Sequence, residues 1–328
     1  MATNRSSKRI LYLDVVKAVA ITLVCIGHAP LLATMDRPSV LHEWIYSFHM
    51  PLFMMISGFF SLHALQKPFK EFIISKSLQL LIPAFSISAL TIITCFLIGW
   101  GNMAETARAE AIGGMWFLRT LFACYVFLWL VKRIPLPDKF LCPLSIIFAC
   151  VFPHGYFLQF NWMLMFFWAG IILKKSFQSY ERHRLQITIF SAIFFLFLGR
   201  HAVPILITYQ NMAHHPLIIL WQLVTALSAS IAIMGLAYYL CVGKLSTAFK
   251  AVGGAGTYTL GIYGLQSIVL QRIFVKFIHF DLTQGSSVIS DFVIIPLLGI
   301  ASTILCYYLT IWLKRYRITN LILFGNQY

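Results

Sequence analysis

The chain has 328 residues, of which 60% are hydrophobic and 11% are charged. A soluble domain usually carries about 25% charged residues, so this composition, with a mean hydropathy of +0.83, excludes an ordinary soluble protein. The net charge of +15 does not indicate nucleic acid, because the basic residues lie between apolar segments and do not form one solvated face. We expect contact with membrane lipids and no nucleic-acid partner.

Apolar segments of helical length follow one another along the chain, and none alternates as a barrel strand would. They predict an all-α, polytopic membrane protein with about ten transmembrane helices. Windows of roughly 20 residues place these helices at 10–32, 44–65, 78–100, 115–131, 141–151, 160–173, 185–198, 216–242, 257–277 and 288–313. The longest connections, near 101–114 and 199–215, have the size of ordinary loops. Residues 1–328 are therefore predicted to form a single integral membrane domain without a separate soluble domain.

The basic residues predict how the chain is oriented in the membrane. Most of the 25 lysines and arginines lie in alternate connections, those on the same side as the N-terminus. The opposite connections hold only Arg37, Arg108, Arg200 and Lys276. Cytoplasmic loops carry such an excess of Lys and Arg. Both termini are thus predicted to be cytoplasmic, in a multi-pass protein of the bacterial cytoplasmic (inner) membrane.

The first predicted span contains three ionisable residues, Asp14, Lys17 and His28. A charge inside a spanning helix costs several kcal/mol unless it is paired or faces a hydrated cavity, so these residues are functional candidates. Lys17 and His28 are eleven positions apart, which is about three helical turns and about 16 Å, so both project from one face. The spacing predicts a polar groove with two depths. Asp14 and Lys17 are three positions apart and can form an ion pair, either as part of a site or only to neutralise each other.

His28 lies near the predicted outer end of this span, beside Gly27 and just before Pro30. The proline interrupts the backbone hydrogen bonds of the helix, which favours a wet cavity over sealed packing. A histidine there is suited to general-base work on a hydroxyl. An antiparallel second span would bring His49 close to His28 and place Ser57 deeper.

Other candidate sites are less specific. Arg119 in the fourth span either binds an anion of a glycan or extends its charge to the interface. The glycine run at 253–256 does not follow a strand, so it is interpreted as a turn between helices. The seven cysteines include no Cys-x-x-Cys pair, which argues against disulfides and zinc. We expect neither a metal nor a tightly bound cofactor.

The first span has the order Asp14, Lys17, ten further residues and His28, and the second contains the runs Phe48-His49-Met50-Pro51-Leu52-Phe53 and Ile56-Ser57-Gly58-Phe59. Together these motifs resemble those of the acyltransferase-3 family of membrane acyltransferases. Weaker similarities lie at 116–118, 166–170 and 258–266. The chain is most similar to the short branch of fucose 4-O-acetylase-like proteins.

The resemblance implies transfer of an acyl group, usually acetyl from acetyl-CoA, to a hydroxyl of an extracytoplasmic or lipid-linked glycan. His28 matches the essential histidine of the family. Lys17 stands where the wider family has a basic residue, commonly arginine, whose planar bidentate contact a lysine cannot make. Gln266 stands where many members carry a histidine.

These observations lead to one hypothesis for the site. An acyl-CoA co-substrate enters from the cytoplasm with its anionic part near Lys17 and reaches His28, the catalytic base, which activates the acceptor hydroxyl. Asp14, His49, Ser57 and Arg119 are donor-binding or supporting residues, and Asp36 or Glu43 orients the imidazole. Direct transfer and an acyl-enzyme both remain open. The alternative function is a transporter or flippase for a glycan or lipid, which would favour repeated halves that the sequence lacks.

Overall fold

The computed structural model describes residues 11–35, 37–199, 205–242, 246–283 and 287–325. Helix occupies each of the ten predicted ranges, and the only strands in the described part are two short ones. Six described helices are long and apolar enough to cross a membrane, namely Leu11–Leu32, Phe69–Leu97, Met103–Val131, Phe157–Lys175, Pro216–Val242 and Ser290–Leu313, and Arg184–Leu198 is a shorter apolar helix. The prediction of an all-α polytopic membrane protein is confirmed, whereas its orientation in the membrane stays a prediction.

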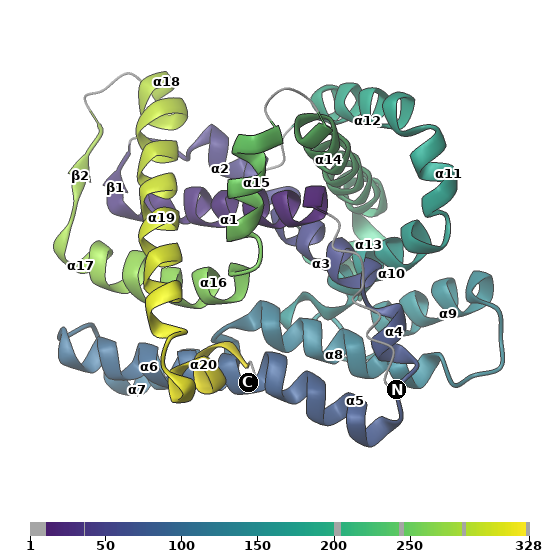
Figure 1. Ribbon diagram of the computed structural model, residues 1–328, viewed down its shortest axis with the longest axis horizontal. Coiled ribbons are helices and arrows are strands. Elements are labelled where there is room, and N and C mark those ends of the chain that lie inside the picture. Colours follow the sequence, from purple (N-terminus) through teal and green to yellow (C-terminus); the bar gives the residue numbers. More distant parts are fainter. Residues whose placement is uncertain (1–10, 36, 200–204, 243–245, 284–286, 326–328) are drawn as a thin grey trace.

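Helix α1 (Leu11–His28) runs through the middle of the molecule (Figure 1). Its residues Leu13, Val16 and Ile21 are at most 1% exposed. Apart from Asp14, Lys17 and His28 the residues of α1 are almost all apolar, as is expected of a helix buried on most of its sides. It packs against α3 (His49–Phe59), α14 (Pro216–Val242), α15 (Ser246–Ala255), α16 (Thr259–Ile268) and α19 (Ile295–Leu313). Helix α19 crosses it steeply. The helix that carries the ionisable residues is thus the centre of the fold.

The predicted second span, 44–65, is not one continuous helix. The structure divides it into α2 (Val40–Tyr46), α3 and α4 (Leu62–Leu65). The Ser39 side chain caps α2 by accepting from the His42 amide at 3.3 Å. The chain then turns at Phe48, whose φ of −146° is not helical. Pro51 lies in the first turn of α3, where a missing N–H costs nothing. The break places α2 across the end of α1.

Helices α3 and α10 (Phe160–Lys175) approach each other at backbone distance. A Cβ added to Gly58 would lie 2.0 Å from the Phe167 carbonyl oxygen, and one added to Gly170 would lie 2.0 Å from that of Met55. Only glycine fits at both positions, because the obstructing atoms belong to the backbone. Small residues at such crossings allow close helix packing in membranes, so this contact fixes α3 beside α1.

Two long helices contain a π turn immediately before a proline. Residues Ser77–Leu81 form one between α5 (Phe69–Lys76) and α6 (Ile82–Leu97), and Ser290–Ile294 form another before α19. Pro83 and Pro296 lie in the first turn after each one. Because proline cannot donate the usual bond to the residue four positions earlier, the helix widens locally.

Two predicted connections are helical in the structure. The connection near 101–114 contains α7 (Met103–Gly113), which Asn102 caps before the chain bends at Met115 (φ 49°) into α8 (Trp116–Val131). The glycine run at 253–256 mostly belongs to α15, so its interpretation as a turn is wrong. A Cβ at Gly256 would lie 1.9 Å from the Asp14 carbonyl oxygen. These glycines therefore pack against the start of α1.

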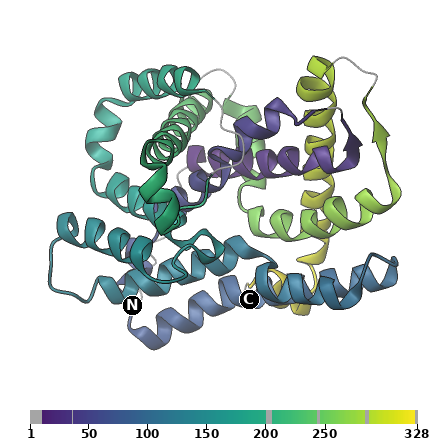
Figure 2. The same cartoon turned by 180° about the vertical axis from the view of Figure 1, so that it is seen from behind.

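The remaining elements cover the edges of the molecule. In Figures 1 and 2, α5, α6 and α8 lie along one edge and α12 along the opposite edge, with α1 between them. The short strand β1 (Ala33–Thr34), just after α1, pairs in parallel with β2 (Phe280–Asp281). The other helices are α9 (Asp138–Val151), α11 (Phe177–Arg182), α12 (Arg184–Leu198), α13 (Tyr209–His214), α17 (Val275–Phe277), α18 (Ser287–Ile289) and α20 (Arg317–Phe324), with 3-10 turns at Ala29–Leu32 and Phe157–Gln159 and a π turn at Val269–Phe274.

Candidate active site

One face of α1 borders cavities along most of the length of the helix. Lys17, Ile21, Val24 and His28 follow one another at intervals of four, three and four positions, which places them on a single helix face. Lys17 and Ile21 line one cavity, and Val24 and His28 line a second. Where the sequence predicted one polar groove with two depths, the structure has two cavities, and the one at Lys17 is mostly apolar.

The cavity at Lys17, here called the lysine cavity, has a volume of about 260 Å³. Its walls are mostly apolar and come from α1, α3, α8 and α16, and they include Met50, Phe53, Ile56, Ser57, Phe60, Leu121, Tyr125, Leu260 and Tyr263. Lys17 Nζ is 2.9 Å from Asp14 Oδ1, as their spacing predicts, and its side chain is 27% exposed. The Ser57 hydroxyl donates to the Phe53 carbonyl at 2.9 Å, so its hydrogen is already used within the helix.

The cavity at His28, the histidine cavity, has a volume of about 390 Å³. His28, Tyr46 and His49 form one wall, and the rest includes Met50, Pro51, Trp116, Gln159, Asn161, Trp162 and Tyr263. Met50 and Tyr263 border both the lysine cavity and the histidine cavity. The two spaces are thus neighbours along α1, and these two side chains form part of the wall of each.

Tyr46 is the centre of a histidine cluster at the end of α1. Its hydroxyl is 3.2 Å from His28 Nδ1. Its ring stacks on His42, with ring centroids 3.8 Å apart, and is 4.8 Å from the His49 ring. A Cβ at Gly27 would lie 2.9 Å from the Tyr46 ring. Glycine at this position therefore allows the tyrosine to reach His28.

Two backbone carbonyls fix the hydrogens of the neighbouring histidines. His42 Nδ1 donates to the Gly27 carbonyl at 2.9 Å, and His49 Nδ1 donates to the Ile45 carbonyl at 2.8 Å. Since a carbonyl only accepts, Nδ1 of each ring carries hydrogen and Nε2 of the neutral ring keeps its lone pair. The Tyr46 hydroxyl can either donate or accept. When it accepts from His28 Nδ1, the Nε2 atom of His28 is a base.

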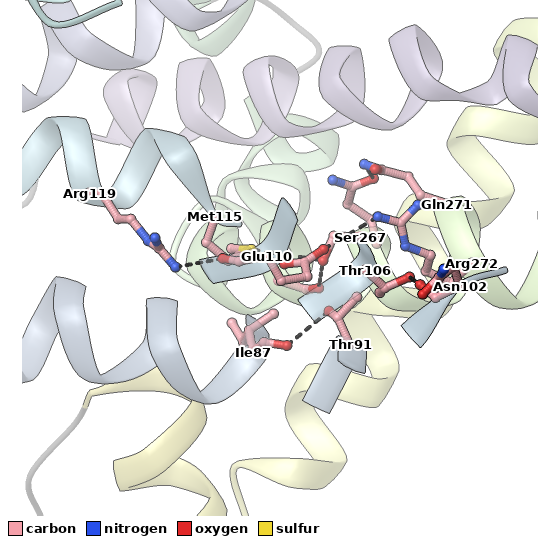
Figure 3. A network of polar contacts seen from close by, with 12 residues as sticks. Ile87, Thr91, Asn102, Thr106, Glu110, Met115, Arg119, Ser267, Gln271 and Arg272 are labelled. Carbon is pink, nitrogen blue, oxygen red and sulfur yellow. Dashed lines mark hydrogen bonds and ion pairs between the residues drawn. The ribbon is translucent and has the colours of Figure 1, made fainter. Parts of the chain in front are cut away.

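A third cavity, the glutamate cavity, also borders His28. It has a volume of about 320 Å³ and is lined by His28, Ala109, Glu110, Gly113, Gly114, Met115, Trp116, Tyr263, Gln266, Ser267, Gln271 and Arg272. Arg272 donates to Glu110 Oε1 at 3.3 Å (Figure 3). Gln271 donates to Gln266 Oε1 at 3.2 Å. This cavity is richer in charged and amide groups than the lysine cavity, and Tyr263 borders all three.

Arg119, a predicted site residue, lies next to the glutamate cavity and is not among its lining residues. Its guanidinium donates to the carbonyls of Glu110 at 3.0 Å and Ala111 at 2.5 Å (Figure 3). These carbonyls belong to the last turn of α7, where the Glu110 carbonyl also accepts from the Gly114 N–H at 3.0 Å, so the arginine acts as a C-terminal cap. Its direct partners are therefore groups of this chain.

The structure brings His28 and His49 together in the histidine cavity, and Lys17 and Ser57 together in the lysine cavity. The partner found for the His28 imidazole is Tyr46, which the sequence reasoning did not single out. Of the two predicted candidates, Asp36 lies outside the described residues, and Glu43 lies in the first turn of α2. Within the described ranges, no group of three His, Cys, Asp or Glu side chains is arranged to hold a metal ion.

The sequence reasoning also missed Glu110, Arg272 and Tyr263. Arg272 had one usable signal, since it is a charge inside the predicted ninth span. Glu110 had no such signal in the sequence, because residues 101–114 were predicted to form a loop. The two residues are 162 positions apart.

Comparisons with known proteins identify the family of the chain. A family model described as an acyltransferase domain matches residues 10–311. Nodulation protein NolL of Mesorhizobium japonicum is 33% identical over 134 residues, which cover 37% of this chain and 35% of that protein. NolL of Sinorhizobium fredii is 32% identical over 142 residues, which cover 38% and 35%. The match thus spans about a third of the length of these curated relatives. No solved structure matches the chain.

Proposed function

We propose that this chain, which belongs to the acyltransferase-3 family and is a membrane acyltransferase, moves an acetyl group from acetyl-CoA to a hydroxyl of a cell-surface or lipid-linked glycan. The observation that carries the proposal is the single face of α1 that lines the lysine cavity at one end and the histidine cavity at the other. Lys17 and His28 mark its two ends, about 16 Å apart along the helix axis. A cation at one end and a base at the other suit a long anionic thioester.

The lysine cavity suits the donor. Its walls are mostly apolar, as a thin pantetheine arm requires, and Lys17 supplies a positive charge for the phosphates. Asp14 holds the lysine at 2.9 Å and limits the directions that the ammonium can take. The excess of basic residues in the predicted cytoplasmic connections favours entry of the donor from the cytoplasm. This implies a protein of the bacterial cytoplasmic membrane.

The histidine cavity suits the transfer step. His28 donates its Nδ1 hydrogen to the Tyr46 hydroxyl, and its Nε2 removes the proton from the acceptor hydroxyl. The acceptor oxygen attacks the thioester carbonyl, so a C–O bond forms and the C–S bond breaks. The proton held by His28 then passes to the leaving thiolate of CoA. Direct transfer is favoured over an acyl-enzyme because the Ser57 hydroxyl is bonded to the Phe53 carbonyl.

The test is an acetyl-transfer assay on the purified protein in lipid nanodiscs. Radiolabelled acetyl-CoA is supplied with a panel of methyl glycosides and bacterial envelope glycans, and the acetylated glycan is identified by mass. General-base catalysis contributes about 10²- to 10⁴-fold, so we expect His28→Ala to lower kcat at least about 100-fold.

His183→Ala is the matched control, since His183 is exposed between α11 and α12. It should keep wild-type activity. Full glycan acetylation by the His28→Ala protein would overturn the catalytic assignment. A wild-type protein that acetylates none of the acceptors would overturn the proposed substrate class.

A further inference from the structure

We infer that the glutamate cavity is the subsite for the acceptor sugar, with Glu110 and Arg272 as the groups that bind its hydroxyls. This inference rests on the proposed function and deepens it. The cavity shares His28, Trp116 and Tyr263 with the histidine cavity. A sugar bound there lies against the base, while the thioester arrives along α1 from the lysine cavity.

The lining of the cavity fits a sugar better than it fits the donor. Glu110, Gln266, Gln271 and Arg272 bring both acceptors and donors to a space of about 320 Å³. A sugar ring carries hydroxyls in several directions, and each needs such a partner once water has been removed. The pantetheine arm of the donor has only two amides and one hydroxyl along a thin chain, so it would leave more of these groups unpaired than a sugar ring would, and each buried group without a partner is unfavourable.

Arg272 has hydrogen-bonding capacity left over. One of its terminal nitrogens binds Glu110 at 3.3 Å, a long contact, and its side chain is 28% exposed. Its Nε–H is buried and has no partner among the described residues. A buried N–H without an acceptor raises the free energy of the protein, and a ligand oxygen that accepted its hydrogen bond would remove this penalty.

The backbone around Glu110 explains how the carboxylate is held at the cavity. Helix α7 ends at Gly113, and Arg119 caps its last carbonyls, including that of Glu110 itself. Arg119 is therefore a positioning residue for this subsite. Gly114 lies beside the carboxylate, because a Cβ there would lie 2.3 Å from Glu110 Oε2, whereas a Cβ at Gly113, another lining residue, would meet nothing within 4 Å.

This open space provides a direct test. Gly113→Leu adds a large side chain at the lining of the cavity with no clash at its Cβ, and the helix tolerates leucine. We expect the KM for the acceptor glycoside to rise about tenfold, equivalent to about 1.4 kcal/mol, with the KM for acetyl-CoA unchanged. Ala104→Leu is the control, since it adds the same side chain to the exposed start of α7.

A second set of variants separates sugar binding from a purely structural ion pair. Arg272→Gln and Glu110→Gln should each raise the acceptor KM, again with unchanged acetyl-CoA KM. The exchanged pair Glu110→Arg with Arg272→Glu restores the ion pair but reverses donor and acceptor positions. We expect its acceptor KM to stay high. A return to the wild-type acceptor KM would show that the pair only holds α7 in place, and would overturn the subsite.

Different experimental results would overturn the inference and the proposed function. A wild-type protein that acetylates no glycoside or glycan overturns the proposed function. An active wild-type protein whose acceptor KM is unchanged by Gly113→Leu and by Arg272→Gln overturns only the subsite. Each variant is compared with the wild-type protein on the same glycoside, the one that gives the highest wild-type rate in the panel.

Discussion

Replacing Tyr46 by phenylalanine isolates the contribution of one hydrogen bond to the proposed base. The variant removes the hydroxyl that is 3.2 Å from His28 Nδ1. It keeps the ring, which stacks on His42 at 3.8 Å and lies 4.8 Å from the His49 ring. The packing of α2 against the end of α1 should therefore survive, and the change acts only on the orientation and tautomer of His28.

The magnitude follows from the geometry. At 3.2 Å the contact is at the long end of the range for an N–H···O bond, and such a bond contributes about 0.5–1.5 kcal/mol. If it is lost in the transition state, kcat falls about two- to twelvefold. Loss of the base itself should cost at least about 100-fold. Tyr46→Phe must therefore lie clearly between the wild-type protein and His28→Ala.

The assay is acetyl transfer in nanodiscs, with kcat and both KM values measured separately. We expect Tyr46→Phe to lower kcat and to leave the KM for acetyl-CoA unchanged, and we expect no further loss when it is combined with His28→Ala. Tyr209→Phe is the control, because Tyr209 is 72% exposed. An unchanged kcat would refute the positioning role of Tyr46. A loss as large as that of His28→Ala would show that the tyrosine itself takes part in the chemistry.

Three further variants test the rest of the site and the fold. Lys17→Gln should raise the KM for acetyl-CoA about tenfold, because a charge-assisted contact contributes about 1.5–3 kcal/mol and this lysine is partly exposed. Steady-state kinetics measure this KM, and an unchanged value would contradict the donor role. Ser57→Ala should keep most of kcat, since its hydroxyl is committed to the Phe53 carbonyl, and a loss of about 100-fold or more would instead favour an acyl-enzyme. Gly170→Val should destabilise the protein by about 1–3 kcal/mol through overpacking, because its Cβ would lie 2.0 Å from the Met55 carbonyl oxygen. An unchanged thermal unfolding midpoint in detergent would argue against the close contact between α3 and α10.

The sequence was sufficient for features that depend on composition and helical periodicity. It predicted the membrane class and a helix in each of the ten ranges, because long apolar runs have few alternatives in a bilayer. It also placed Lys17 and His28 on one face of a helix and Asp14 beside Lys17, since positions on a regular helix follow from the number of residues between them. The residues of the proposed site that lie on α1 could therefore be predicted from the sequence alone.

Tertiary structure decided what lies opposite that face. The turn at Phe48 interrupts an apolar run that looked continuous, and it brings Tyr46 to His28. Glu110 and Arg272 meet although 162 positions separate them, because α6 packs against both α7 and η4, the π turn at Val269–Phe274 that carries Arg272. No local pattern encodes such a contact, since it depends on how helices distant in the chain pack around α1. The sequence alone thus determined one wall of the site, and the packing of the other helices determined the walls that face it.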